Sequence, residues 1–162
     1  EETMTAPVDV VEFQLGEEHY ALDIQIAREI VEMMPITPLP RAPEYLAGII
    51  NLRGEITNII DLRNLLGLPE SEEADSRKII VLMPDVAGGS NVGIIVDDVH
   101  GVISVRDDQI EHINEGITSS ISSYVKAIIK IGGEDDEKIE TLIIWLNVQK
   151  VISDIGHYQN AP

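Results

Sequence analysis

The sequence predicts an all-β protein made of two similar halves. Most apolar residues fall in short β-branched runs broken by Gly, Asn, Asp and Pro, which is typical of strands joined by tight turns. Helical patterns are few and short, and a ten-residue pattern from the first half returns in the second, which indicates a duplication. Many short strands separated by turn signals favour a sandwich or barrels.

Nine segments are expected to be strands because they combine β-branched residues with flanking turn residues. They are residues 8–15, 19–24, 49–52, 56–60, 78–83, 92–96, 102–105, 127–131 and 141–146. A short helix is expected over 61–66, where Gly67 supplies a stop and Pro69 follows. A single helical turn is expected over 43–47, ending at Gly48.

The internal repeat relates YLAGIINLRG at 45–54 to YVKAIIKIGG at 124–133. An apolar strand follows each copy, NIIDL at 58–62 and LIIWL at 142–146, and a fainter echo relates 20–31 to 92–103. Chance similarity between strand-rich segments is the alternative. Halves of roughly 70 residues bury little apolar surface alone, so we expect a shared core.

A single domain is expected over residues 8–153, with flexible termini at 1–7 and 154–162. Its two halves are expected to meet near residues 70–90, with a first strand that both halves could share.

Composition excludes several classes of function. With 11 basic against 29 acidic residues and a net charge of -18, the chain lacks the basic patch that nucleic acid or anionic lipid requires. It has no cysteine, which excludes disulfides and thiolate zinc sites and is compatible with a reducing cytoplasm. The longest apolar runs are far shorter than the roughly 20 residues that span a bilayer, and residues 1–12 resemble no signal peptide.

No catalytic or metal-binding constellation is recognisable, and no cofactor is expected. The histidines are scattered without a helical i, i+4 pair, which favours solvated surface side chains over metal ligation; they are His19, His100, His112 and His157. The acidic pairs at 97–98 and 107–108 are expected at solvated strand ends rather than in an acid–base site. The segment AGGSNVG at 87–93 lacks the lysine of a phosphate loop and is expected to be a hairpin loop.

Arg53 stands directly before the glycine of a turn. Strand alternation places it on one face with Ile49 and Asn51. The second copy of the repeat has Gly132 at this position, so the turn itself does not require arginine. Two interpretations remain open, a surface ion pair with Glu55 or Glu44 and an exposed arginine that recognises a partner.

The string AGIINLRGEITNIIDLRNLLGL at 47–68 closely resembles the segment that marks the CheW family of chemotaxis coupling proteins. The resemblance continues in FQLGEEHYALDIQIAREIVE at 13–32, VGIIVDDVHGVISV at 92–105 and SSYVKAIIKI at 122–131, and it covers roughly residues 8–153. Asn58 replaces the proline that the family usually has after the turn. Trp145 and Asn147 lie in a strand where the family commonly has a second aspartate.

This resemblance implies two five-stranded SH3-like barrels that share a hydrophobic core, with a few short helices. It implies a cytoplasmic adaptor without enzyme activity that joins the regulatory domain of a CheA-type histidine kinase to the tip of methyl-accepting chemoreceptors. It would reach the membrane through the receptors, without insertion. Receptor binding is implied around Arg53, Asn51 and Ile49, and kinase binding around Glu29, Ile30 and Gly48.

Two alternatives stay open. The chain could be a CheW-like domain cut from a longer protein, either the kinase's own regulatory domain or a coupling protein fused to a receiver. A double barrel that binds a small ligand, or a hydrolase with an unrecognised site, is the alternative from another class, and a deep closed pocket would favour it. Trp145 is expected in a core, and exposure would instead mark an interface.

Overall fold

The computed structural model describes residues 7–69, 76–112, 124–132 and 140–159, with side chains up to 155. Its strands are β1 (Val8–Leu15), β2 (Glu18–Asp23), β3 (Ala27–Glu32), β4 (Leu46–Leu52), β5 (Glu55–Asp61), β6 (Lys78–Leu82), β7 (Val92–Val96), β8 (Asp98–Val105), β9 (Ile110–Glu111), β10 (Val125–Ile131) and β11 (Thr141–Leu146). The helices are α1 (Leu62–Leu66) and α2 (Val148–Gln159), with 3-10 turns η1 (Ile24–Ile26), η2 (Pro84–Ala87) and η3 (Asp107–Gln109).

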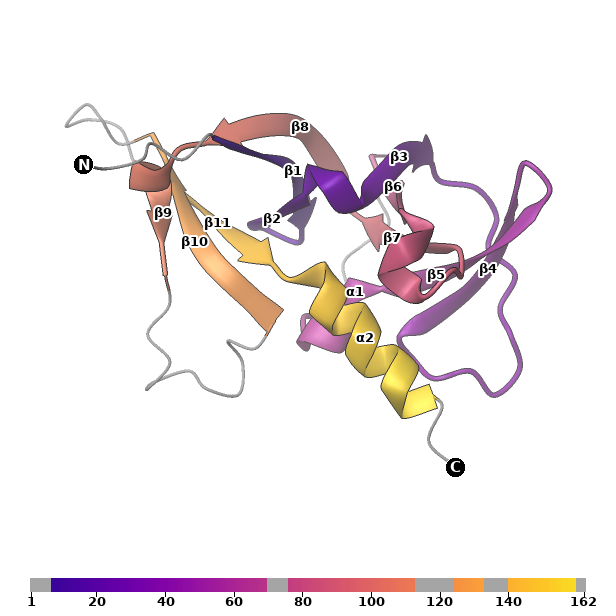
Figure 1. Cartoon of the computed structure of the whole chain (residues 1–162). Coiled ribbons are helices and arrows are strands. Elements are labelled where there is room, and N and C mark those ends of the chain that lie inside the picture. The colour runs from indigo at the N-terminus through magenta and orange to yellow at the C-terminus, as the bar shows by residue number, and fades with distance from the viewer. Residues whose placement is uncertain (1–6, 70–75, 113–123, 133–139, 160–162) are drawn as a thin grey trace.

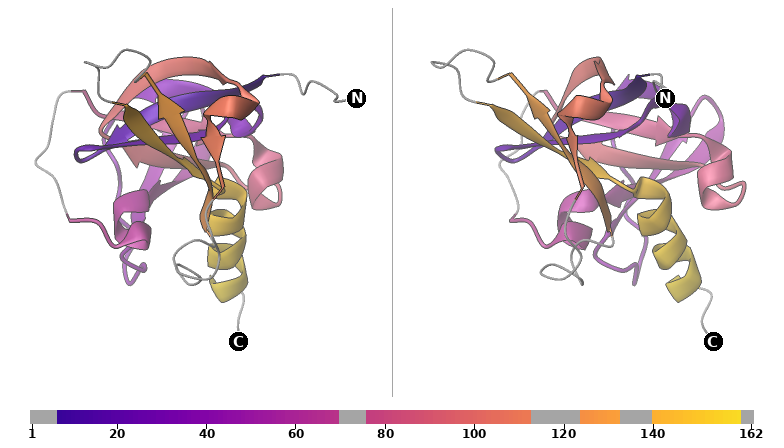
Figure 2. Two further views of the ribbon diagram at one scale, coloured as in Figure 1. Left: turned by 90° about the vertical axis from the view of Figure 1, so that its left-hand side faces the viewer. Right: turned by 60° about the vertical axis from the view of Figure 1, so that its left-hand side comes forward.

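These strands form two sheets, which confirms the predicted all-β class. The six-stranded sheet has the order β8-β1-β2-β11-β10-β9 and the five-stranded sheet the order β3-β6-β7-β5-β4. They lie at opposite ends of the molecule in Figure 1, and the further views in Figure 2 show α2 beside them. No helix among the described residues is long and apolar enough to cross a membrane.

The chain changes sheets twice, between β2 and β3 and again between β7 and β8. The five-stranded sheet is therefore one continuous stretch, whereas the six-stranded sheet combines both ends of the chain. The boundary predicted near residues 70–90 separates the two sequence repeats rather than the two sheets, and it stays a prediction. Repeats and sheets do not coincide because β3 follows the β1–β2 hairpin in sequence but pairs with β6 of the other sheet.

The five-stranded sheet is closed by its own chain. Thr37, just after β3, pairs with Ile49 of β4 through two backbone hydrogen bonds of 2.9 Å. This bridge links the chain beyond one edge strand to the other edge strand, so the sheet curls into a barrel and leaves no free edge there.

The strand registers of the two hairpins follow one plan, as the predicted duplication requires. The β4–β5 and β10–β11 hairpins each carry a register shift one residue after their first pair. The carbonyls of Tyr45 and Tyr124 each accept a 2.8 Å bond, from Asp61 and Asn147 respectively. These registers equate Asn58 with Ile144, two residues from the alignment predicted for 58–62.

The strand pairings also match the fainter echo between 20–31 and 92–103. Tyr20 of β2 pairs in parallel with Ile144, and Val92 of β7 pairs in parallel with the equivalent Asn58. Each unit is thus a hairpin, a strand that crosses to the other sheet, a second hairpin and a helix.

A hydrophobic core lies between the sheets, as predicted. It combines Phe13 and Leu22 of the six-stranded sheet with Ile80 and Ile94 of the five-stranded sheet, and all four are fully buried. Each sheet also has a smaller cluster of its own, around Ile129 in one and Ile59 in the other. Because neither half could bury enough surface alone, this shared core makes the two halves one folding unit.

The helices differ in how well the sequence predicted them. α1 begins after Asp61, whose side chain accepts from the Arg63 amide, and ends at Gly67 with φ of 71°, as expected. The predicted turn over 43–47 is too long. The Leu46 amide closes a turn onto the Pro43 carbonyl at 3.0 Å, and β4 begins there, so Gly48 lies inside the strand.

α2 was not predicted, and it extends to Gln159 through residues expected to be a flexible terminus. Asn147 caps it by accepting from the Lys150 amide at 3.1 Å. Val148, Val151 and Ile152 enter the shared core. Their i, i+3, i+4 spacing was the available signal for this helix.

Candidate partner-binding site

Arg53 and Gly54 are the two turn residues of the β4–β5 hairpin, since Leu52 pairs with Glu55. Their φ angles are 52° and 88°, as a two-residue turn with two left-handed positions requires. The Asn51 side chain accepts from the Gly54 amide at 2.8 Å and holds the turn closed. Asn51 is exposed, and its side chain stabilises this turn.

Arg53 is not the residue that this backbone favours. A non-glycine residue in the left-handed region costs roughly 1–2 kcal/mol. The equivalent Gly132 has φ of 82°, and glycine adopts this conformation without strain. The Arg53 side chain is 61% exposed. The strained position and exposure make Arg53 a candidate for a binding role.

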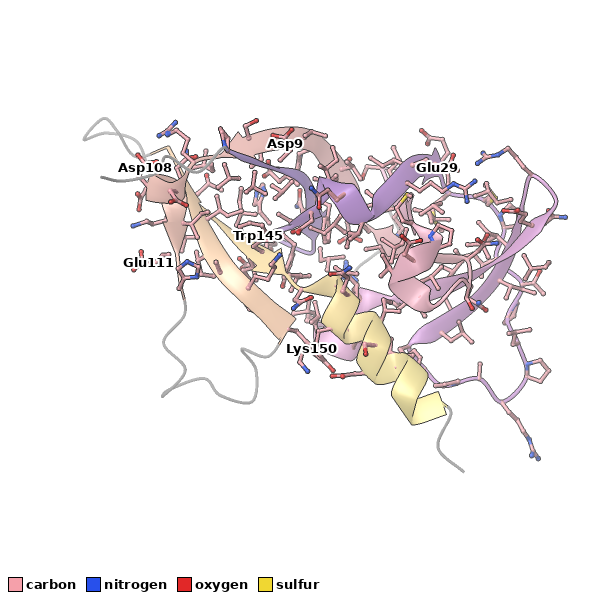
Figure 3. The ribbon with its side chains drawn as sticks, in the orientation of Figure 1. Asp9, Glu29, Asp108, Glu111, Trp145 and Lys150 are labelled. Carbon is pink, nitrogen blue, oxygen red and sulfur yellow. The ribbon has the colours of Figure 1, made fainter. Side chains whose placement is uncertain are left out.

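The Arg53 guanidinium donates a hydrogen bond to the carboxylate of Glu29 on β3. The sequence suggested an ion pair between Arg53 and Glu55 or Glu44, and the structure shows the ion pair with Glu29. Glu29 is 27% exposed and lies at the end of the molecule distant from Asp108 and Glu111 (Figure 3). The residues predicted for receptor binding and for kinase binding therefore adjoin.

Two exposed apolar side chains lie on β3 and β5, near Glu29 and Arg53 in sequence. Ile30 follows Glu29 on β3 and is 42% exposed, and Ile56 of β5 is 57% exposed. Ile56 pairs with Asn51 across the hairpin, so the two share a face. Exposed apolar side chains and arginine are both found at protein interfaces.

Gly48 and Ile49 both contact Thr37 of the same chain. Gly48 is buried, and a Cβ atom there would lie 2.3 Å from the Thr37 carbonyl oxygen. Ile49 is half-buried and forms the bridge to Thr37. The close approach at Gly48 is thus made by the chain itself.

The structure also contains a buried ion pair that sequence reasoning missed. Arg63 of α1, 7% exposed, pairs with Asp97, which is 16% exposed. The Asp97 carboxylate also accepts from the Gly16 amide at 2.6 Å. The expectation of a solvated strand end at Asp97 is therefore wrong, because the chain crosses between the sheets here and the carboxylate is enclosed.

The histidines are less scattered than their sequence spacing suggested. His19 and His100 stack with ring centroids 5.1 Å apart, because β2 and β8 both flank β1. His112 is exposed, as expected, and the side chain of His157 lies outside the described residues.

Trp145 belongs to a core, as predicted. It is 7% exposed, and its indole donates to Asp23 at 2.6 Å while Lys126 lies 4.8 Å from the ring centroid. A hollow lined by Asp23 and Lys126 has a volume of about 10 Å³. That is room for one water, whereas small-molecule sites have volumes of about 300–1,000 Å³.

Known proteins resemble this chain over most of its length. The CheW-like domain family matches residues 9–156. The chain belongs to the CheW family. The chemotaxis protein CheW of Treponema pallidum is 34% identical over 149 residues, which cover 89% of this chain and 81% of that protein. The CheW of Thermotoga maritima is 29% identical and covers 91% and 89%.

A solved structure extends the agreement to the fold. The crystal structure of scaffolding protein TtCheW from Thermoanaerobacter tengcongensis superposes with a TM-score of 0.73 at 34% identity, covering 91% of this chain and 89% of that one. The function predicted from the sequence, a non-enzymatic CheW scaffold of chemotaxis signalling, is confirmed by these matches.

Proposed function

We propose that this CheW protein couples the cytoplasmic tip of methyl-accepting chemoreceptors to the regulatory domain of a CheA-type histidine kinase. Arg53, with Asn51 and Ile49, contributes the receptor contact. Glu29 and Ile30 contribute the kinase contact, and Gly48 supports both by letting Thr37 close the barrel. Such a scaffold works in the cytoplasm and reaches the membrane through the receptors.

One observation carries this proposal: an exposed arginine occupies a left-handed position where the equivalent residue is Gly132. A receptor tip is a helical hairpin, and the planar guanidinium can fix the register of a helix through paired hydrogen bonds. Ile30 and Ile56 add apolar surface to the same end of the molecule.

The test is a binding titration of the purified protein against a receptor-tip fragment and against a CheA regulatory domain. Arg53→Ala is expected to weaken receptor binding by at least about thirtyfold, or ~2 kcal/mol, as is typical of a central interface arginine. Arg53→Glu is expected to be worse, because it adds another negative charge to an acidic chain.

Arg41→Ala is the matched control, since Arg41 is also exposed and has φ of 62°. It should leave both affinities unchanged. Equal receptor affinities for wild type and Arg53→Ala would return Arg53 to the role of an ordinary surface ion pair.

A further inference from the structure

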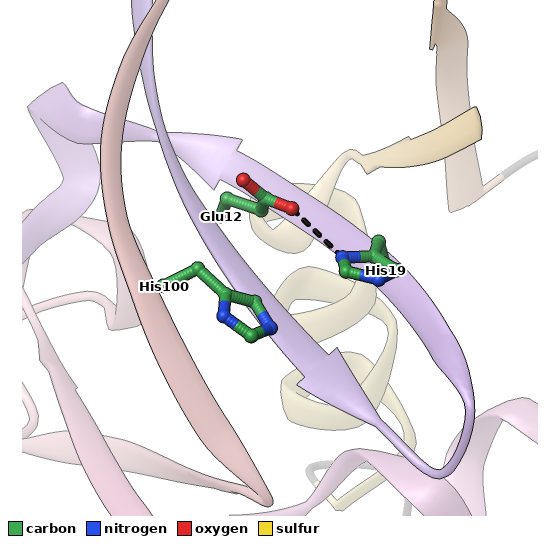
Figure 4. Close-up of side chains that lie close together, drawn as sticks. All are labelled: Glu12, His19 and His100. Atoms are coloured by element: carbon green, nitrogen blue, oxygen red, sulfur yellow. Dashed lines mark hydrogen bonds and ion pairs between the residues drawn. The ribbon is translucent and has the colours of Figure 1, made fainter. Parts of the chain in front are cut away.

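Three polar side chains from neighbouring strands of the six-stranded sheet lie together. They are Glu12 of β1, His19 of β2 and His100 of β8, and one ligand atom from each lies within 4.8 Å of the others. Figure 4 shows the three side chains gathered on one side of β1. Imidazole nitrogen and carboxylate oxygen are the atoms that bind Zn²⁺ when cysteine is absent.

The sheet register explains the cluster. His19 pairs with Gln14 across the β1–β2 hairpin, and Glu12 lies two residues along on the same face. His100 is the bulged residue of β8, between partners of Glu12 and Phe13. A bulge changes the direction of a side chain, so His100 reaches the other two.

Hydrogen bonds hold both imidazole rings in place. His19 Nδ1 lies 2.8 Å from the Glu12 carboxylate and His100 Nε2 lies 3.0 Å from Gln14 Oε1. Gln14 Nε2 donates to the Gly16 carbonyl at 2.7 Å, which fixes the amide orientation. Both ring contacts end on acceptors, so each ring donates there, and its other nitrogen keeps a lone pair when the ring is neutral. The Gln14 bond orients His100 in the way that is common for metal-binding histidines. The His19–Glu12 bond joins two proposed ligands and is replaced when both bind the ion.

The duplication shows that the fold does not require these residues. By the strand registers, Glu12 corresponds to Val81, His19 to Asn91 and His100 to Arg28. The equivalent position in the five-stranded sheet therefore has no such ligand set, although its backbone follows the same plan.

We propose that Glu12, His19 and His100 bind a divalent transition-metal ion, with Zn²⁺ as the best match to two imidazoles and one carboxylate. Tetrahedral bonds of about 2.0–2.1 Å place ligand atoms roughly 3.3 Å apart, so modest side-chain rotations suffice. Water fills the fourth position. Because the side chains of Glu12 and His19 are 15% and 33% exposed, an ion can reach the site from solvent. This inference is independent of the coupling role.

The experiment is calorimetric titration of chelator-treated protein with Zn²⁺ in excess Mg²⁺, which occupies unspecific carboxylate sites. One saturable Zn²⁺ per chain is expected. His100→Ala should weaken affinity by at least about tenfold, since even residues that only orient a ligand cost that much. Exposed His112 provides the matched control, and His112→Ala should bind as wild type does. Co²⁺ absorption in the visible range should appear with wild type and be lost in His19→Ala.

Melting curves without metal show whether each variant is folded, and Glu12→Gln serves as the second test if His19→Ala is not. Unchanged Zn²⁺ affinity in His100→Ala, an equal loss in His112→Ala, or binding without saturation would overturn the proposal and assign the ion to scattered surface carboxylates.

Discussion

The β4–β5 and β10–β11 hairpins have the same register and the same bulge position, and each is followed by a capped helix. Their tips differ. Arg53 occupies a left-handed position in one hairpin and Gly132 occupies it in the other. The strand registers are shared but the connections are not, since two residues join β4 to β5 and nine join β10 to β11. Gly132 shows that this left-handed position accepts glycine, so what Arg53 adds there is a charge.

The same comparison separates apolar from charged positions. Ile30 corresponds to Val102 and Ile56 to Leu142, and all four are at least 42% exposed. By contrast, Glu29 corresponds to Gly101. Both sheets thus expose apolar side chains at these positions, but only the five-stranded sheet places the Arg53–Glu29 pair among them.

The largest expected effect concerns the helices that follow the two hairpins. Arg63 of α1 corresponds to exposed Gln149 of α2. Arg63→Ala leaves Asp97 enclosed, with the Arg77 guanidinium 3.8 Å from its carboxylate. Breaking a buried pair costs 3–5 kcal/mol, and the lower end applies because Arg77 remains. We expect ~3 kcal/mol by urea denaturation and a melting temperature roughly 6–12 °C lower.

Gln149→Ala is the matched control and should change the free energy of unfolding by less than about 0.5 kcal/mol. A loss below ~1 kcal/mol for Arg63→Ala would mean that Arg77 replaces Arg63, and the ion pair would not explain how the sheet crossing is held.

The next effect tests the closure of the five-stranded sheet. Gly48 corresponds to Ala127, which is 1% exposed. Gly48→Ala must adopt φ near 147° and place a methyl group 2.3 Å from the Thr37 carbonyl oxygen. We expect a loss of ~3 kcal/mol from strain and displacement of the bridge, whereas Ala127→Gly should cost about 1 kcal/mol. Equal losses in the two denaturation curves would contradict the assigned role of Thr37.

Nine of the eleven described strands, the repeat pattern and α1 could be predicted because each depends on local chemistry, whereas β3 and β9 were missed. β-branched runs, turn residues and the Asp61 and Gly67 caps act within a few residues. The repeat also predicted the shared core, since each half is too small to fold alone.

The contacts that could not be predicted from the sequence depend on how strands cross between the two sheets. Local patterns do not show that β3 pairs with β6, so neither the Arg53–Glu29 pair nor the Arg63–Asp97 pair was predicted. The same holds for His19 and His100, which are 81 residues apart in sequence. They meet in the structure because β2 and β8 pair with opposite edges of β1. Gly48 was predicted to contact a partner protein. A glycine in this position indicates that another group lies close to the backbone, but the sequence does not show that this group is Thr37 of the same chain.

A smaller effect is expected when the first hairpin receives the glycine of the second. Arg53→Gly gives the first turn the residue of the second and removes the cost of a left-handed arginine, roughly 1–2 kcal/mol. Glycine's greater freedom in the unfolded chain offsets part of this gain. We expect stability to rise by about 0.5–1 kcal/mol in urea denaturation while receptor affinity falls as in Arg53→Ala. Lower stability in Arg53→Gly than in Arg53→Ala would show that backbone strain is not what distinguishes the tips.

The smallest expected effect is the coupling between Arg53 and Glu29. Their side chains are 61% and 27% exposed, and exposed pairs contribute 0.2–1 kcal/mol in double-mutant cycles. Arg53→Ala, Glu29→Ala and the double variant should give a coupling energy of about 0.5 kcal/mol, smaller still in 1 M salt because screening is stronger. So weak a pair would let Arg53 exchange Glu29 for a carboxylate of a partner at little cost, and would leave Glu29 accessible when it does. A coupling energy above ~2 kcal/mol would instead make the pair a structural link across the barrel, and the arginine would then be explained without any partner.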